Sequence, residues 1–162
     1  MSGTSDRTNS LGRKVLCIDD DLHVLDLERA ILETAGCKVL LANSGEEGIN
    51  IAKNHAMDIV VVDSEMPRVS GTQVAQSLRI MRPKLPIIMV SGGNLPDEAA
   101  MIVDCFVPKT TMVTHLVQEV YRLTNCPKIC PLCGLPIEQE QRPSVALADG
   151  KEVHVECYSK TV

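Results

Sequence analysis

The chain has 162 residues, of which 44% are hydrophobic and 23% charged, enough for one ordinary core and one small appendage. Its formal net charge of -5 excludes a general attraction to nucleic acid or anionic lipid, which needs surplus Lys and Arg. No run approaches the roughly 20 apolar residues of a membrane helix, and the start MSGTSDRTNSLGRK lacks the apolar stretch of a secretory signal. We therefore expect a cytoplasmic protein that binds neither nucleic acid nor a membrane.

After a polar segment, residues 1–12, which we expect to be disordered, short apolar runs alternate with longer segments of helical periodicity. This alternation predicts a doubly wound α/β domain over residues 13–125, built on a five-stranded parallel sheet. Such sheets place their chemistry at the carboxyl ends of the strands. The predicted strands are Val15–Ile18, Val39–Ala42, Ile59–Val62, Ile87–Val90 and Cys105–Val107.

The helices between the strands are predicted from apolar residues three or four positions apart and from their end signals. Gly36 is expected to end the first helix, Ser44 with Glu47 to open the second as a capping box, and Pro83 to stop the third. The expected core faces are Val24, Leu27, Ile31 and Ala35 in the first helix, Val74, Leu78 and Met81 in the third, and Val113, Leu116, Val120 and Leu123 in the last.

Polar side chains follow four of the predicted strands directly. Asp19, Asp20 and Asp21 follow the first strand, and Asp63 follows the third. Ser91 follows the fourth strand and Lys109 the fifth, so all of these side chains are expected along one edge of the sheet. Carboxylates that converge at one sheet edge repel each other unless a cation neutralises them, and oxygen ligands of this kind suit Mg²⁺. We interpret Asp21 as a helix cap, and Asp19, Asp20 and Asp63 as the converging set.

The segments VLCIDDD, DIVVVDSEMPRVSG, PIIMVSG and FVPK occur in this order, each at a strand end. Together they resemble the motifs of bacterial two-component response regulator receiver domains, over about residues 14–125. The resemblance implies a flavodoxin-like receiver fold, a cytoplasmic phosphorelay, and a histidine kinase or phosphotransfer protein as the donor. A downstream protein partner of unknown identity would read the signal.

By the same resemblance, Asp63 is the phosphoacceptor, and Asp19, Asp20, Asp63 and the backbone carbonyl of Glu65 bind Mg²⁺. Lys109 is the lysine that the family carries, Ser91 is the switch hydroxyl, and Phe106 is the switch aromatic residue. Without the resemblance, Phe106 would be interpreted as core, Ser91 as a helix cap and Lys109 as a surface lysine. The protein would promote its own phosphoryl transfer and dephosphorylation without being an enzyme that turns over a separate substrate.

Two features depart from the family pattern. Pro108 precedes Lys109 and Thr110 follows it, whereas the family usually has proline after the lysine with a cis bond between the two. A cis bond before Thr110 would cost about 2.5 to 4 kcal/mol, so the bond is either strained or trans. The stretch between Ser91 and Lys109 is also short, which predicts that the fourth helix is a stub and that the output face is altered.

The segment 126–162 is predicted to be a small zinc-binding tail. Its four spaced ligands are Cys130, Cys133, His154 and Cys157, two close pairs whose separation suits a tetrahedral structural zinc site. The spacing resembles half of a LIM domain or a related zinc knuckle. A closed set of four ligands leaves no position for catalysis. Cys126 is interpreted as an unused thiol, with an alternate ligand as the other possibility.

Three functions remain open from the sequence. The first is a phosphorylation-dependent signalling protein whose zinc tail stabilises it or contacts a partner. The second is a pseudo-receiver that does not depend on phosphorylation and acts as a zinc-stabilised adaptor. The third is a Mg²⁺-dependent phosphatase on the same acidic edge, for which no separate general acid can be named.

Overall fold

The computed structural model describes residues 12–124, 128–129, 132, 136–137, 144–147 and 152–160. The chain divides near residue 124 into two units, of which the larger covers residues 11–124 and the smaller includes residues 125–162. In the described residues, no helix has both the length and the apolar character needed to cross a lipid bilayer.

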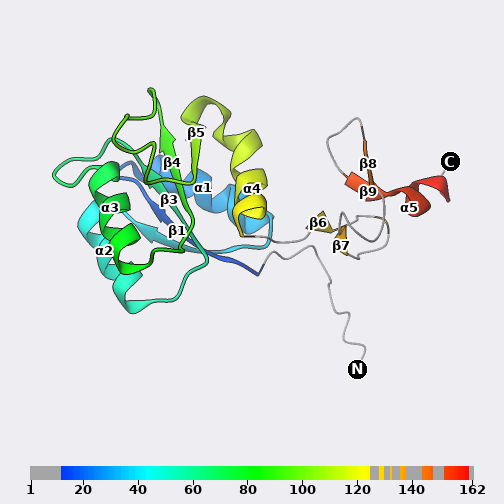
Figure 1. The fold of residues 1–162 in the computed structure, drawn as a ribbon, viewed down its shortest axis with the longest axis horizontal. Helices are drawn as coiled ribbons and strands as arrows, with labels where there is room; N and C mark the ends of the chain where they lie inside the picture. The colour runs from blue at the N-terminus through cyan, green and yellow to red at the C-terminus, as the bar shows by residue number, and fades with distance from the viewer. Residues whose placement is uncertain are drawn as a thin grey trace. The chain divides into compact units, whose positions relative to one another are not determined.

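The larger unit is a parallel five-stranded sheet in the order β2-β1-β3-β4-β5. Figure 1 shows α1 and α4 on one side of this sheet and α2 and α3 on the other. In chain order the elements are β1 (Lys14–Ile18), α1 (Leu22–Thr34), β2 (Lys38–Ala42), α2 (Gly45–Asn54), β3 (Ile59–Asp63), α3 (Gly71–Met81), β4 (Ile87–Ser91), β5 (Cys105–Pro108), the 3-10 turn η1 (Lys109–Thr111) and α4 (Met112–Leu123).

The sheet confirms the predicted strands to within one residue at each end. β3 and β4 are buried along their whole length, because both of their faces are covered by helices. Lys14 pairs with Lys38 and Val15 with Ile59 in parallel register, so β1 lies between β2 and β3. This order places the carboxyl ends of β1 and β3 side by side, and for that reason Asp19 and Asp63 lie close together.

The core face of α1 differs from the prediction. The buried residues are Leu25, Glu28 and Leu32, whereas Leu27 is 43% exposed. The prediction was wrong because it followed apolar residues alone, and a carboxyl group occupies the central position of the buried face. The predicted end of the helix is confirmed, since Gly36 adopts a positive φ of 86° and its N–H donates to the Glu33 carbonyl.

The last helix and the helix caps show smaller differences. The buried face of α4 consists of Met112, Leu116 and Val120, whereas Val113 is 61% exposed. The predicted face therefore starts one residue late.

Ser44 caps α2 by accepting from the Glu47 N–H, but the Glu47 carboxylate accepts from the Asn43 N–H rather than from the N–H of the cap residue. A full capping box lies instead at α3, between Ser70 and Gln73.

The connection between β4 and β5 is short and contains no α-helix. Every residue from Gly92 to Asp104 is described, and the segment forms hydrogen-bonded turns in which Ala99 N–H donates to the Pro96 carbonyl. In place of the expected helical stub there is a run of overlapping turns at residues 97–102. Asp104 closes the connection, because its N–H donates to the Ile87 carbonyl and its carboxylate accepts from the Ile87 N–H at 2.8 Å.

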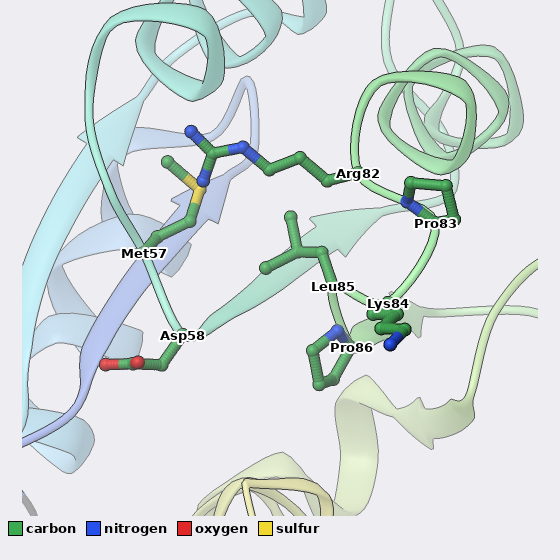
Figure 2. A pocket seen from close by; sticks show the side chains of 7 residues that line it. All are labelled: Met57, Asp58, Arg82, Pro83, Lys84, Leu85 and Pro86. Atoms are coloured by element: carbon green, nitrogen blue, oxygen red, sulfur yellow. The ribbon is translucent and has the colours of Figure 1, made fainter.

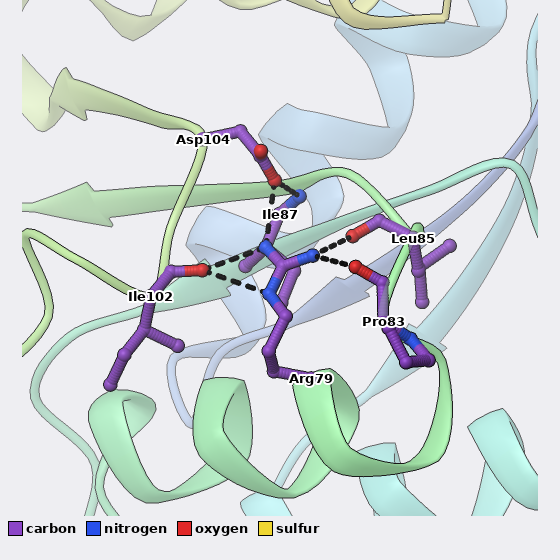
Figure 3. Close-up of polar contacts among 6 residues, drawn as sticks. All are labelled: Arg79, Pro83, Leu85, Ile87, Ile102 and Asp104. Atoms are coloured by element: carbon purple, nitrogen blue, oxygen red, sulfur yellow. Dashed lines mark hydrogen bonds and ion pairs between the residues drawn. The ribbon is translucent and has the colours of Figure 1, made fainter.

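Arg79, on α3, holds this connection from the side (Figure 3). Its guanidinium donates to the Pro83 carbonyl at 2.8 Å and to the Leu85 carbonyl at 3.0 Å. It also donates to the Ile102 carbonyl at 2.7 Å and pairs with the Asp104 carboxylate at 2.9 Å. One planar side chain thus donates to three carbonyls and one carboxylate, and it joins the loop before β4 to the end of the connection before β5.

We expect Arg79→Lys to lower the free energy of unfolding by about 2 kcal/mol. A lysine keeps the charge but cannot direct donors to four acceptors in the plane of a guanidinium, so several carbonyls lose their partner. Urea denaturation measures the change. Arg29→Lys is the matched control, because Arg29 pairs with Asp26 at an exposed surface and should change stability by less than about 0.5 kcal/mol. Equal effects of the two variants would contradict the role given to Arg79.

The smaller unit contains short antiparallel pairs in its described residues. β6 (Lys128–Ile129) pairs with β7 (Pro136–Ile137), β8 (Ser144–Ala146) pairs with β9 (Glu152–His154), and α5 (Val155–Ser159) follows. Val153 is fully buried, and Val145, Leu147 and Cys157 pack against it.

Candidate functional site

The fold brings four polar side chains together at the carboxyl edge of the sheet. Asp19 follows β1, Asp63 ends β3, Ser91 ends β4, and Lys109 follows β5. Asp19, Asp63 and Ser91 are nearly inaccessible, at 1%, 4% and 1% exposure. The prediction that these residues converge is confirmed.

Lys109 joins the two buried aspartates. Its Nζ lies 3.1 Å from Asp19 Oδ2 and 3.3 Å from Asp63 Oδ1. The described residues contain no cis peptide bond, so the bond between Lys109 and Thr110 is trans. The displaced proline therefore does not keep the ammonium group from the acids, because the 3-10 turn that begins at Lys109 directs it to them.

Asp19, Asp20 and Asp63 form a group that can hold a divalent cation. Each offers one carboxylate oxygen, and these oxygens lie within 4.8 Å of one another. Asp19 Oδ1 accepts from the Asp21 N–H at 2.8 Å, while its buried Oδ2 has, among the described residues, no partner beyond the ion pair with Lys109. Closely spaced carboxylate oxygens of this kind fit the ligand preference of Mg²⁺.

The electrostatics of the site reflect burial of like charges. Burial raises the pKa of Asp63 to about 6, the Asp19 charge adds to the rise, and Lys109 opposes it. Burial also raises the pKa of Asp19. Burial alone would lower the pKa of Lys109, but the hydrogen bond and charge of Asp19, with the charge of Asp63, raise it above its ordinary value. The lysine is therefore a fixed positive charge, and the acids gain from any further cation.

The remaining predicted residues lie around this centre. Ser91 Oγ accepts from the Gly93 N–H at 3.1 Å, which leaves its own hydrogen available for donation. Phe106 is half-buried in β5 and pairs in register with Met89 of β4. Glu65 is exposed in the loop after β3. Asp21 caps α1 by accepting from the His23 N–H at 2.9 Å, as predicted.

Glu28 is an ionisable residue near this site that the sequence analysis missed. It lies on the buried face of α1, is 1% exposed, and accepts a hydrogen bond from the Cys17 thiol. Burial raises the pKa of Glu28 to about 8, and the Asp19 charge adds to the rise. Its Oε2 has no hydrogen-bond partner among the residues that the structure describes. A signal was present in the sequence, since Glu28 falls three residues after Leu25 and four before Leu32.

Gly71, the first residue of α3, lies directly against the main chain of Asp63. A Cβ added at Gly71 would collide with the Asp63 carbonyl oxygen, and Gly71 N–H donates to the Ser64 carbonyl at 3.1 Å. The backbone that carries Asp63 is thus packed against a helix start that has no room for a side chain.

We expect Gly71→Ala to lower the free energy of unfolding by about 2 to 3 kcal/mol, because backbone atoms must move to admit the methyl group. Gly92→Ala is the control, since a Cβ at Gly92 meets nothing within 4 Å and should change stability by less than about 0.5 kcal/mol. Urea denaturation of both variants measures the difference. A Gly71→Ala protein as stable as the wild type would show that this contact is not tight.

The predicted zinc ligands are only partly visible. Cys130 and Cys133 lie outside the described residues, as does Cys126. His154 ends β9, and Cys157 lies half-buried in α5, next to Val153. The four-ligand zinc site therefore stays a prediction from the sequence.

Comparison with known proteins gives the family. The model of the response regulator receiver domain matches residues 15–120. The cell cycle response regulator CtrA of Brucella ovis is 34% identical over 79 residues, which are 49% of this chain and 34% of CtrA. The CtrA of Brucella abortus (strain 2308) matches to the same extent. The chain thus spans about a third of the length of these curated relatives.

Solved structures agree with the fold. The response regulator protein TrrA from Thermotoga maritima, in complex with Mg(2+)-BeF, has a TM-score of 0.66 and 26% identity, covering 68% of this chain and 98% of its own. A CheY-like receiver domain protein from Methanospirillum hungatei JF-1 has a TM-score of 0.66 and 24% identity, covering 70% of this chain and 94% of its own. With the family model matching 15–120, this chain belongs to the response regulator receiver domain family.

Proposed function

We propose that this chain accepts a phosphoryl group on Asp63 from a histidine kinase or phosphotransfer protein, and signals by contact with a downstream protein. The observation that carries the proposal is the contact of the Lys109 ammonium with both Asp19 and Asp63, beside three carboxylates that fit one divalent cation. The protein acts as a stoichiometric acceptor that promotes its own transfer and dephosphorylation, and not as an enzyme with a separate substrate.

Asp63 is the nucleophile in this scheme. One of its carboxylate oxygens attacks the phosphorus of a phosphohistidine, the nitrogen–phosphorus bond breaks, and the leaving imidazole nitrogen keeps the electron pair. Lys109 stays protonated and offsets the negative charge on the phosphoryl oxygens, and its contact with Asp63 places it within reach of them. The Ser91 hydroxyl, whose hydrogen is available, would then donate to a phosphoryl oxygen of the product.

Mg²⁺ would be held by Asp19, Asp20, Asp63 and the backbone carbonyl of Glu65, and when bound it supplies charge neutralisation at the phosphoryl oxygens. The complex of TrrA with Mg(2+)-BeF supports this part of the proposal. Phe106, half-buried beside Met89, is the residue expected to rotate when Ser91 moves toward the phosphoryl group.

Incubation with acetyl phosphate and Mg²⁺, followed by intact-mass measurement, tests the proposal. The expected result is one added phosphoryl group per chain, lost on treatment with hydroxylamine because acyl phosphates react with it. Absence of any added mass, under conditions that label an ordinary receiver domain, would contradict the proposal.

A second candidate is a phosphorylation-independent adaptor stabilised by zinc. The observation that favours it is the short connection from Gly92 to Asp104, which has turns where the signalling helix is usual and which Arg79 holds in place. An adaptor would bind its downstream partner equally before and after treatment with acetyl phosphate, whereas the leading proposal requires a change in that affinity.

The tail carries the other part of the proposal, a structural zinc ion bound by Cys130, Cys133, His154 and Cys157. The support is the spacing of the two ligand pairs and the small apolar surface of a tail of this length, for which a bound metal supplies folding energy.

We expect native mass spectrometry to find one zinc ion per chain in protein purified without chelator, and none after Cys130→Ser is combined with Cys157→Ser. Removing two thiolates from a tetrahedral site leaves too few ligands to hold the metal. Cys126→Ser should retain the zinc ion, because Cys126 is expected to be an unused thiol. Loss of zinc in Cys126→Ser, or its retention in the double variant, would show that the ligand set is different.

A further inference from the structure

Cationic side chains gather at the amino ends of the strands, the edge of the sheet opposite to Asp63. Lys14 begins β1, Lys38 begins β2, and Arg82 and Lys84 lie in the loop before β4. We refer to these four residues as the basic edge. The three lysines are exposed, and in the part of the chain that the structure describes none of them forms an ion pair. This concentration of positive charge stands out in a chain of net charge -5.

The carboxylates nearest to the basic edge are already engaged. Asp58 precedes β3, and its Oδ2 accepts from the main-chain N–H of Lys14 at 2.8 Å. Asp104 pairs with Arg79 and accepts from the Ile87 N–H. The bond from the Lys14 N–H orients the Asp58 carboxylate but leaves its charge, so Asp58 offsets one of the four cations of the basic edge. The Asp104 charge is paired with Arg79.

Two hollows lie along this edge, on either side of the segment 55–58. The larger, of about 510 Å³, lies between Met57 and Asp58 on one side and the loop 82–86 on the other (Figure 2). The smaller, of about 190 Å³, is lined by Lys14, Lys38 and the residues around His55. The larger hollow lies beside the starts of β3 and β4 and the smaller beside the starts of β1 and β2, and we refer to the two hollows together as the track.

Arginine side chains that donate to main-chain carbonyls fix the wall of the larger hollow. Arg82 Nη2 donates to the His55 carbonyl at 2.8 Å, which ties the loop 82–86 to the segment 55–58. On its other flank, Arg79 donates to the carbonyls of Pro83 and Leu85, so the same loop is fixed from two directions (Figure 3). A surface fixed in this way loses little conformational freedom when a ligand binds.

We propose that the basic edge binds an extended acidic segment of a partner protein, whether or not Asp63 is phosphorylated. Adjacent strands are about 4.8 Å apart, so four strands span roughly 15 Å, the length of about four or five extended residues. Charge complementarity selects Asp- and Glu-rich segments, and the apolar walls given by Met57, Leu85 and Pro86 accept the aliphatic parts of such a segment.

Other polyanions fit less well. A nucleic acid site usually neutralises about 6 to 10 phosphates, more than four cations can contact, and the overall charge of -5 repels a long polyanion. An anionic lipid surface would need several apolar side chains to insert, and Ile80, 83% exposed and two residues before Arg82, offers one beside the basic edge.

The position of the basic edge implies that partner binding there is separate from phosphorylation. A five-residue strand such as β3 separates the amino edge from Asp63 by about 15 Å, beyond the Debye length at physiological salt. The charge of a phosphoryl group is therefore largely screened at the basic edge, and a partner could stay bound while the opposite edge changes state.

Fluorescence anisotropy of labelled hexaglutamate with the full chain tests this inference. The expected result is binding that weakens with added salt and falls roughly tenfold in Lys38→Glu combined with Lys84→Glu. Lys160→Glu and Asp63→Asn should leave the affinity within about twofold, the first because Lys160 is an exposed lysine of the smaller unit. Circular dichroism melting checks that each variant is folded. We expect the lysine variants to fold, because the substituted lysines are exposed.

Three outcomes would overturn the inference. They are an equal loss of affinity in Lys160→Glu, loss of binding in Asp63→Asn, or tighter binding of a duplex oligonucleotide or of phosphatidylserine vesicles than of hexaglutamate. Because the binding assay uses unphosphorylated protein, its failure leaves the proposed role of Asp63 untouched. A failure to label Asp63 likewise leaves the basic edge untouched.

Discussion

Asp63→Asn is expected to abolish labelling by acetyl phosphate completely, while the fold and its stability are retained. The amide that replaces the carboxylate is a far weaker nucleophile, and Asp63 ends β3, which lies between β1 and β4, whereas Asp19 follows β1. The variant also removes a buried negative charge whose pKa is raised mainly by burial and next by Asp19, so we expect stability equal to or above that of the wild type at neutral pH.

Intact mass after incubation with acetyl phosphate and Mg²⁺ measures the labelling. Asp97→Asn is the matched control, because Asp97 is an exposed aspartate in the turn after β4 and should be labelled as the wild type is. Equal labelling of Asp63→Asn and the wild type would place the acceptor elsewhere. If the Asp20→Asn variant is labelled and the Asp63→Asn variant is not, Asp63 is the phosphoryl acceptor and Asp20 is not essential for the transfer.

Glu28→Gln is expected to stabilise the protein at pH 8 by on the order of 3 kcal/mol, and to change stability little at pH 4.5. The pKa of Glu28 is about 8 in the folded chain, against an ordinary value of 4.5, because of burial first and then the Asp19 charge. Between these two pH values the unfolded chain releases a proton that the folded chain retains, so Glu28 makes stability fall as pH rises from 4.5 toward 8. Glutamine is neutral throughout and removes this contribution.

Urea denaturation of the metal-free protein at several pH values measures the effect of Glu28→Gln. The difference between variant and wild type isolates Glu28 from Asp19 and Asp63, whose pKa values are also raised by burial. Glu33→Gln, an exposed position on the same helix, is the control and should show no such pH dependence. A stabilisation independent of pH would mean that Glu28 is not protonated in the folded chain near neutral pH.

The sheet and the acidic site could be predicted because their signals are local. An apolar run such as Ile59–Val62 specifies a buried strand, and polar residues directly after parallel strands must meet at one edge of the sheet. The sequence did not show whether Lys109 would contact Asp19 and Asp63 when proline precedes it instead of following it. The direction of the Lys109 side chain depends on the trans bond before Thr110 and on the 3-10 turn, which only the structure shows.

What could not be predicted depends on contacts between distant parts of the chain. Glu28 was passed over because a carboxyl group is expected in water, and only the packing of α1 on the sheet shows that it is buried. The bonds of Arg79 to Ile102 and Asp104 join residues more than 20 positions apart and leave no periodic pattern. The basic edge has the same character, since Lys14, Lys38 and Lys84 come together only when the strands are ordered.

The Arg79 contacts also limit the movements that β4 and β5 can make relative to each other. Arg79 and Asp104 fasten the start of β5 to the start of β4, and no helix separates the two strands. Ser91 and Lys109 lie at the opposite, carboxyl ends of β4 and β5. If β5 moves relative to β4, we therefore expect it to rotate about the fastened ends rather than to slide along β4. The largest movement is then expected at the edge of the sheet that carries Asp63, and the smallest beside the basic edge.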